Sequence, residues 1–184
     1  MAPKRITYQI KETLDGIRPP IWRRILVRSD DSLVELHYTI QIAMGWENYH
    51  LHHFIVGDVF YGVPDPEYLC EMYDESGVLL CNIAPDVGDK FKYEYDFGDG
   101  WLHTVLVEKI VESERGVKLP VVIKGRRACP PEDVGGPWGY ELFLEAMKDP
   151  EHPEHEMYTG WIGNEFDPEA FDLPGVNKIM RESR

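Results

Sequence analysis

The sequence predicts an α+β fold: a mainly antiparallel sheet built from hairpins, with a few helices packed on it. One observation that predicts this fold is that apolar and polar residues alternate in pairs of segments joined by turns. The pattern is clearest over residues 90–111. The other is residues 33–44, where apolar side chains recur at the spacing of a helix. A chain of 184 residues suits one domain, which we expect to span residues 1–184.

The aromatic hairpin gives the strongest strand signal. Phe91, Tyr93, Tyr95 and Phe97 share one face, and the charged residues between them share the other. The chain turns at residues 98–100 before it returns. Other segments with strand-like patterns are residues 6–14, 21–27, 50–56 and 117–123. Residues 61–85 have weak periodicity and several prolines, which indicates a long loop with short elements.

A helix is predicted over residues 33–44, and both of its ends carry a signal. Ser32 and Glu35 have the spacing of a capping box, in which each side chain satisfies a free amide at the helix start. Gly45 follows the last apolar residue of the stripe and is expected to end the helix in a left-handed conformation. This helix is expected to pack on one face of the sheet.

The C-terminal third is richer in proline and glycine. Residues 129–139 are predicted to form an ordered loop over the domain, burying the apolar or amphipathic side chains of Cys129, Trp138 and Tyr140. Residues 140–147 predict a short amphipathic helix. The sequence Asp167-Pro168-Glu169 has the composition of a helix start and predicts a last short helix.

The charge balance limits the classes of partner. With 19 basic against 33 acidic residues the formal net charge is −14, so binding to nucleic acid is not expected. No apolar run approaches the length of a membrane span, so no membrane association is expected. Three cysteines cannot form a closed set of disulfides, which favours reduced thiols and a cytoplasmic location. A protein partner or self-association stays open.

A candidate site combines the strand at residues 50–56 with the turn of the aromatic hairpin. His50 and His52 are expected on the same strand face, and Asp99 lies at the turn, where its carboxylate is free to reach. Imidazole and carboxylate groups in one place could hold a divalent metal such as zinc or exchange protons. The expected metal ligands are His50, His52, Asp99 and His103. The expected ligand-binding residues are Trp46, His50, His52, Asp96, Asp99, Trp101 and His103, with Trp46 and Trp101 as the walls of a cleft.

Each of these residues also has a purely structural interpretation. His50 and His52 could hydrogen-bond to backbone carbonyls, and Asp99 could stabilise its own turn. The histidines and carboxylates of residues 151–156 could hold a metal or form a solvated surface segment. Cys129 could be a thiol nucleophile or a buried structural cysteine. Sequence motifs of hydrolases, zinc proteases, phosphate loops and EF-hands are absent.

Four segments together resemble the plasmid pRiA4b ORF-3-like family. They are Gly16-Ile17-Arg18-Pro19-Pro20-Ile21-Trp22-Arg23-Arg24, residues 43–46 with His50-Leu51-His52, residues 93–101 with His103, and residues 129–133 with 135–140. The segments occur in order over nearly the whole chain. The resemblance implies a compact α+β domain of the prokaryotic cytoplasm, without an established activity. Some relatives carry a resolvase label linked to mobile elements, but this chain lacks a basic helix-turn-helix segment.

Three functional hypotheses follow. The first is a binding or interaction module without catalysis, because aromatic and charged residues are plentiful while catalytic motifs are absent. The second is a metal-dependent enzyme, hydrolase-like, that uses a His/Asp site. The third is a DNA-transaction protein of a mobile element, which the net charge disfavours.

Overall fold

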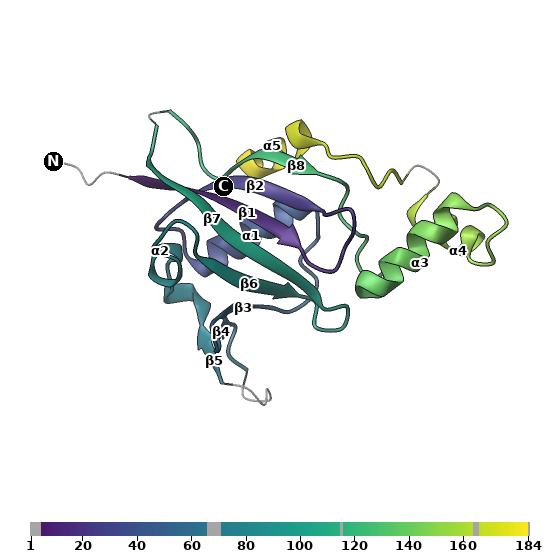
Figure 1. Ribbon diagram of the computed structural model, residues 1–184, viewed down its shortest axis with the longest axis horizontal. Coiled ribbons are helices and arrows are strands. Elements are labelled where there is room, and N and C mark those ends of the chain that lie inside the picture. Colours follow the sequence, from purple (N-terminus) through teal and green to yellow (C-terminus); the bar gives the residue numbers. More distant parts are fainter. Residues whose placement is uncertain (1–4, 66–70, 115, 164–165, 184) are drawn as a thin grey trace.

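The protein folds around one eight-stranded sheet (Figure 1). The computed structural model describes residues 5–65, 71–114, 116–163 and 166–183. The strands are β1 (Ile6–Leu14), β2 (Trp22–Arg28), β3 (His52–Val56), β4 (Val59–Gly62), β5 (Met72–Asp74), β6 (Lys90–Tyr95), β7 (Trp101–Glu112) and β8 (Val121–Arg126). Their order is β5-β4-β3-β6-β7-β1-β2-β8, and every neighbouring pair is antiparallel except β4 and β5. The predicted α+β class with a mainly antiparallel sheet is confirmed.

The aromatic hairpin lies at the centre of this sheet, as predicted. β6 and β7 pair antiparallel, with Tyr93 opposite His103 and Tyr95 opposite Trp101. Tyr93, Tyr95 and Trp101 are fully buried. The alternation seen in the sequence therefore separates a core-facing side from a side that carries polar residues.

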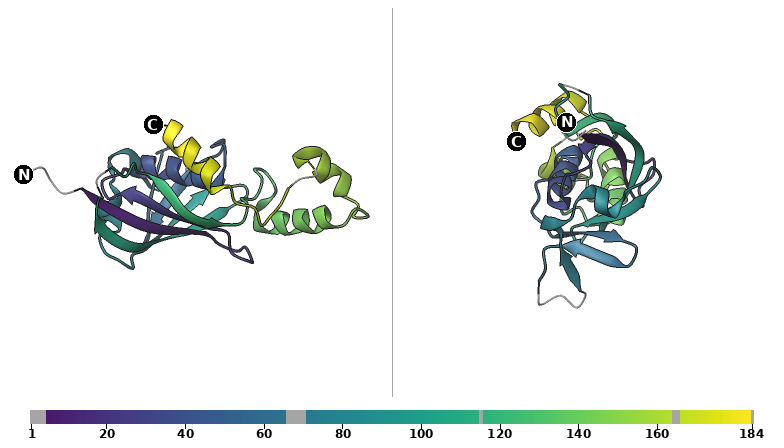
Figure 2. Two further views of the ribbon diagram at one scale, coloured as in Figure 1. Left: turned by 90° about the horizontal axis from the view of Figure 1, so that it is seen from above. Right: turned by 90° about the vertical axis from the view of Figure 1, so that its left-hand side faces the viewer.

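The predicted helix is α1 (Leu33–Met44), and both of its predicted ends are confirmed. The capping box between Ser32 and Glu35 is formed, and Gly45 ends the helix with a φ of 99°. The helix buries Leu36 and Ile40 in the core. α5 (Leu173–Glu182) lies beside α1 on the same face of the sheet (Figure 2).

The remaining helices are short or lie at one end of the molecule. α2 (Leu80–Ile83) and a 3-10 turn (Glu75–Gly77) follow β5. The expected loop with short elements is therefore confirmed for the described residues of 61–85, which do not include residues 66–70. α3 (Gly136–Lys148) and α4 (His155–Ile162) pack on each other and extend beyond one end of the sheet (Figures 1 and 2).

The opposite face of the sheet is covered by its own polar side chains. Arg24 and Gln9 both donate to the Glu108 carboxylate, and Lys92 pairs with Asp15 at 2.6 Å. Antiparallel sheets commonly keep one face in solvent in this way. At the β8 edge, Asn177 of α5 donates to Val122 O and accepts from Val122 N, which occupies edge groups that would otherwise be open to another strand.

Five local expectations were wrong. The last strand starts at Val121 instead of residue 117, because Pro120 before it has no N–H for the ladder. α3 begins at Gly136 rather than residue 140, and Trp138 in its first turn is 73% exposed instead of buried. Residues 167–170 form a turn, and the last helix starts later with Asp172 as its N-cap. His50 precedes β3, so it does not share a strand face with His52.

Candidate functional site

The four residues expected to hold one metal lie in separate environments. The ring of His52 stacks on that of His37, with centroids 3.4 Å apart, and its Nε2 lies 3.0 Å from both oxygens of buried Glu75. His103 is fully buried, 2.7 Å from Glu12. His50 instead meets acidic residues of a different loop. The structure therefore does not bring His50, His52, Asp99 and His103 together as one set of ligands.

Two further site expectations need correction. Asp99 does not face the histidines: its Oδ2 accepts a hydrogen bond from Gly135 N at 3.0 Å. The turn is stabilised instead by Asp96, whose Oδ1 accepts from Gly98 N at 2.9 Å. Trp101 has no exposed surface and belongs to the core, so it cannot form a cleft wall, whereas Trp46 does line a groove.

The structure brings His50 together with three carboxylates. His50 Nε2 lies 2.9 Å from Asp133 Oδ1, 3.6 Å from Asp96 Oδ2 and 3.9 Å from Glu132 Oε2. In the part of the chain that the structure describes, His50, Asp96 and Asp133 form the one group of metal-ligating side chains whose ligand atoms all lie within 4.8 Å of one another. We call these residues with Glu132 the His50 cluster.

Backbone conformation holds the two aspartates of the cluster in place. Asp96 has a φ of 56° and Asp133 a φ of 58°, both in the left-handed region that L residues seldom adopt. Such a conformation costs about 1–3 kcal/mol and tends to occur at functional sites. Because Oδ1 of Asp96 is engaged by Gly98 N, its second oxygen is left pointing at His50.

Tyr95 links the two halves of the cluster. Its hydroxyl accepts from the backbone N–H of Tyr49 at 3.0 Å, next to His50, and donates to Glu132 Oε1 at 3.1 Å. Burial raises the pKa of Tyr95 above its ordinary value, and the nearby Glu132 carboxylate raises it further. The hydroxyl therefore stays protonated and keeps Glu132 beside His50.

The loop that carries Glu132 and Asp133 is held at three further points. Trp46 Nε1 donates to Pro130 O at 3.1 Å, and Glu47 N donates to Glu132 Oε1 at 2.9 Å. The third point is the hydrogen bond from Gly135 N to Asp99 described above. The C-terminal end of α1, the β6–β7 turn and this loop thus meet at one place.

The electrostatics of the His50 cluster are unbalanced. Three carboxylates surround one imidazole, and like charges at such distances repel each other. Asp96 is 6% exposed, so solvent can screen it only weakly. His50 Nε2 is buried and makes no hydrogen bond to the described residues, although Asp133 is near, because the geometry does not suit one.

An aromatic groove of about 400 Å³ adjoins the cluster. Trp46, Tyr49 and Trp161 line it together with Glu132 and Asp133, so a bound molecule could reach the His50 cluster. Cys129 also lines the groove, but burial raises the pKa of its thiol well above the ordinary value. A raised pKa disfavours the thiolate, which argues against a nucleophilic role.

Glu132 and Asp133 were not among the site residues expected from the sequence. They lie far along the chain from His50, in a segment that predicts a loop and has no metal-binding spacing. The residues of 151–156 are engaged locally: His152 Nδ1 accepts from Glu154 N, and His155 Nδ1 contacts Ala146 O.

Fold and site together define an α+β protein with a histidine–carboxylate cluster where the loop after β8 meets the central hairpin. The chain belongs to the Plasmid pRiA4b ORF-3-like protein family, whose model matches residues 6–174. It is 41% identical over 174 residues to the uncharacterized protein y4hQ of Sinorhizobium fredii (strain NBRC 101917 / NGR234), covering 94% of this chain and 89% of that protein. The crystal structure of a protein of unknown function, MM3350 from Methanosarcina mazei Go1, superimposes with a TM-score of 0.85 at 39% identity, covering 95% and 99% of the two chains. Among the described residues, no helix has both the length and the apolar character needed to cross a bilayer.

Proposed function

We propose that this protein is a binding module whose site holds a divalent metal ion in the His50 cluster. His50 Nε2, Asp96 Oδ2 and Asp133 Oδ1 would be the protein ligands, and Glu132 Oε2 the fourth. One imidazole with carboxylates suits zinc and other first-row divalent ions.

The observation that carries this proposal is the position of His50 Nε2. The atom is buried, has no hydrogen-bond partner among the described residues, and faces oxygens at 2.9, 3.6 and 3.9 Å. Tetrahedral zinc with bonds of about 2.1 Å places its ligand atoms about 3.4 Å apart. The distances from His50 Nε2 to the three carboxylate oxygens, 2.9, 3.6 and 3.9 Å, lie on either side of this ligand–ligand separation. A cation among these atoms would also relieve the repulsion between the carboxylates.

The supporting residues fit the same role. Metal ligands are usually oriented by further hydrogen bonds, and loss of such partners lowers metal affinity. Here Gly98 N orients Asp96, and both Tyr95 and Glu47 N orient Glu132. These contacts leave Asp96 Oδ2 at 3.6 Å and Glu132 Oε2 at 3.9 Å from His50 Nε2, and Glu132 Oε2 also lies 3.3 Å from the Tyr95 hydroxyl.

A second candidate function is metal-dependent hydrolysis. Glu132 already accepts a hydrogen bond from Tyr95. In the alternative arrangement His50, Asp96 and Asp133 are therefore the three protein ligands, and the fourth position is free. Catalytic zinc sites have this form. The adjoining groove of about 400 Å³ provides space for a substrate. The test is hydrolysis of nitrophenyl acetate and nitrophenyl phosphate by zinc-loaded protein, compared with the His50→Ala variant.

Calorimetric titration with zinc and manganese, with metal analysis of the dialysed protein, tests the proposed centre. We expect about one ion per chain for the wild type and at least tenfold weaker binding for His50→Ala and Asp96→Asn. Asparagine tolerates the left-handed backbone and can still accept from Gly98 N, so Asp96→Asn should fold.

Two matched controls locate the ion. His52→Ala removes a histidine of the set expected from the sequence, and His152→Ala removes one from the 151–156 segment. Both variants should bind the metal as the wild type does. Unchanged affinity in both His50→Ala and Asp96→Asn, or a loss in either control, would overturn the assignment.

A further inference from the structure

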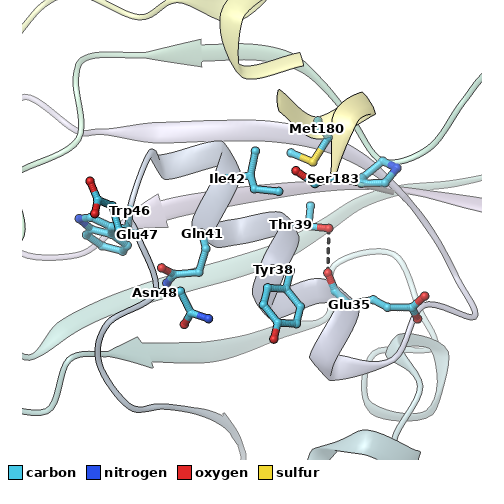
Figure 3. Close-up of a pocket in the computed structure, with 11 residues that line it drawn as sticks. Glu35, Tyr38, Thr39, Gln41, Ile42, Trp46, Glu47, Asn48, Met180 and Ser183 are labelled. Atoms are coloured by element: carbon cyan, nitrogen blue, oxygen red, sulfur yellow. Dashed lines mark hydrogen bonds between the residues drawn. The ribbon is translucent and has the colours of Figure 1, made fainter. Parts of the chain in front are cut away.

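A second groove lies on the outer face of α1, away from the His50 cluster. It has a volume of about 500 Å³ and is enclosed by α1, the segment 46–48 after it, Pro120 and the end of α5 (Figure 3). Trp46 and Glu47 line both grooves, so the two sites share one wall.

The charge of this groove has one sign. Glu47 lines it, whereas the carboxylate of Glu35, another lining residue, is engaged by Ser32 at the helix start and is directed away from the groove (Figure 3). None of the lining residues among those described is a lysine, arginine or histidine. The whole chain carries a formal charge of −14, so the surrounding field has the same sign. Anionic walls of this kind attract cations and repel anions.

A buried acceptor without a donor lies at the floor of the groove. Gln41 is 2% exposed, and its Nε2 donates to the Tyr93 hydroxyl at 2.9 Å. Its Oε1 has no hydrogen-bond partner in the described structure. Figure 3 shows the Gln41 side chain directed to the same part of the groove as Asn48. The negative end of the Gln41 amide therefore adds to the negative potential of the Glu47 carboxylate.

A chain of hydrogen bonds fixes this orientation. Asn48 Oδ1 lies 2.8 Å from His37 Nε2, and His37 Nδ1 lies 2.8 Å from the Tyr93 hydroxyl. Since Asn48 Oδ1 can only accept, His37 Nε2 carries the proton, Tyr93 donates to Nδ1, and the Tyr93 oxygen accepts from Gln41 Nε2. The Gln41 amide nitrogen therefore donates to Tyr93 in the interior, and the amide oxygen has no donor among the described residues.

Aromatic and apolar side chains complete the groove. Tyr38 is 54% exposed and presents ring surface to the groove, and the mostly buried Trp46 lines it beside Glu47. Ring faces attract ammonium and guanidinium groups. Ile42 and Met180 provide apolar surface for the stem of such a ligand. We propose that this groove binds an organic cation, an ammonium or guanidinium group on an apolar stem.

The cation can belong to a free amine or to an arginine or lysine side chain of another protein. Comparing the affinities of a small amine and of a peptide distinguishes these two sources. The probes are agmatine, N-acetyl-argininamide and a five-residue peptide with one central arginine, each titrated by calorimetry and by NMR. The uncharged N-acetyl-citrullinamide has nearly the same shape and tests for charge recognition. We expect the arginine probes to bind at least tenfold more tightly than the citrulline probe. Tighter binding of the peptide than of agmatine would assign a protein segment, and the reverse a free amine.

Variants test whether the cation lies in this groove. Tyr38→Ala and Glu47→Gln should each weaken binding of N-acetyl-argininamide by about 2–5-fold. Matched controls outside the groove are Tyr73→Ala, where Tyr73 is 50% exposed, and Glu141→Gln, and both should leave binding unchanged. Excess EDTA, which removes metal from the His50 cluster, should leave binding of N-acetyl-argininamide unchanged. Loss of metal binding and loss of cation binding can therefore be told apart. Equal binding of the arginine and citrulline probes, no binding of either at millimolar concentration, or equal loss in the controls would overturn the proposal.

Discussion

Glu12 of β1 and His103 of β7 form a pair with no exposed surface, in which Oε1 and Nδ1 are 2.7 Å apart. The ring of Trp46, which lines both grooves, meets the His103 ring edge-on at 5.3 Å. The negative charge of Glu12 also acts on buried Arg23, whose guanidinium donates to the carbonyls of Ala43, Trp22 and Arg126. Glu12, His103 and Arg23 are thus all buried, with no solvent to replace a lost partner.

We expect the Glu12–His103 pair to be energetically coupled. Removing one partner leaves the other buried and uncompensated, so Glu12→Leu and His103→Leu should each lower the free energy of unfolding by about 3–5 kcal/mol. The double variant should lose at least about 1 kcal/mol less than the sum of the two single losses. Urea unfolding of all four proteins measures the coupling. Strict additivity would mean that the pair contributes no mutual stabilisation.

His37 should make the protein less stable in acid. Burial lowers its pKa to about 3, with a smaller contribution from the neighbouring His52, whereas a histidine in the unfolded chain has a pKa of about 6.5. Between these values the unfolded state binds the proton and the folded state does not, so stability is lost as the pH falls from about 6.5 toward 3. Between about pH 7.5 and pH 5 the expected loss from this group is about 2 kcal/mol.

The His37→Gln variant isolates that contribution. Glutamine can keep hydrogen bonds to its neighbours but does not titrate. Urea unfolding at both pH values should show a loss of stability that is about 2 kcal/mol smaller in the variant than in the wild type. An identical pH dependence in the two proteins would show that folding does not lower the pKa of His37.

Gly136 should be intolerant of a side chain because of its contact with the β6–β7 turn. A Cβ at Gly136 would overlap with the backbone oxygen of Asp99, and its φ is 70°. Gly57 has a φ of 60° but open space around it, so Gly57→Ala reports the backbone strain alone, about 1–2 kcal/mol. We expect Gly136→Ala to cost about 1–3 kcal/mol more than Gly57→Ala in urea unfolding.

The same pair of variants tests how the loop is positioned. Gly136→Ala should also weaken zinc binding, because it displaces the loop that carries Glu132 and Asp133, while Gly57→Ala should not. Equal zinc affinity in the two variants would indicate that the contact at Asp99 does not position the site.

Cys129 should react slowly with alkylating reagents. Burial raises the pKa of its thiol well above the ordinary value, so at about pH 8 the thiolate fraction is small. We expect alkylation by iodoacetamide to be at least about tenfold slower than for the same cysteine in urea-unfolded protein. Mass spectrometry of the peptide that contains Cys129 measures both rates. Equal rates in folded and unfolded protein would restore Cys129 as a candidate nucleophile.

Local patterns in the sequence were sufficient for the main elements of the fold. The bounds of α1 followed from Ser32, Glu35 and Gly45, which act through contacts within a few residues of each other. The alternation of aromatic residues placed β6 and β7 at the centre of the sheet, because such a pattern buries one face whatever the rest of the chain does. The start of β8 was wrong by a few residues because Pro120 cannot donate to the ladder. The start of α5 was wrong because a turn and a helix start share the same residue types.

The candidate site depended on long-range contacts. His50 and Asp96 were expected from the sequence, but as part of a set with His52 and Asp99 that the fold separates. The spacing of His50 and His52 suggested a shared strand face, yet Asn48 takes a left-handed conformation and the strand begins only at His52. A local change in backbone conformation of this kind sets the direction of side chains at the end of a strand. Residue spacing in the sequence does not reveal it.

The α+β class, the central hairpin and the capped helix could all be predicted from short stretches of residues, because each depends on burial and hydrogen bonding between near neighbours in the chain. Which polar groups meet depends instead on how distant segments pack against each other. Asp133 reaches His50 because Trp46, Glu47 and Asp99 hold the loop after β8 against the end of α1 and the β6–β7 turn. Contacts between segments so far apart in sequence leave no periodic signal, since their geometry is set by how the whole sheet and its loops pack together.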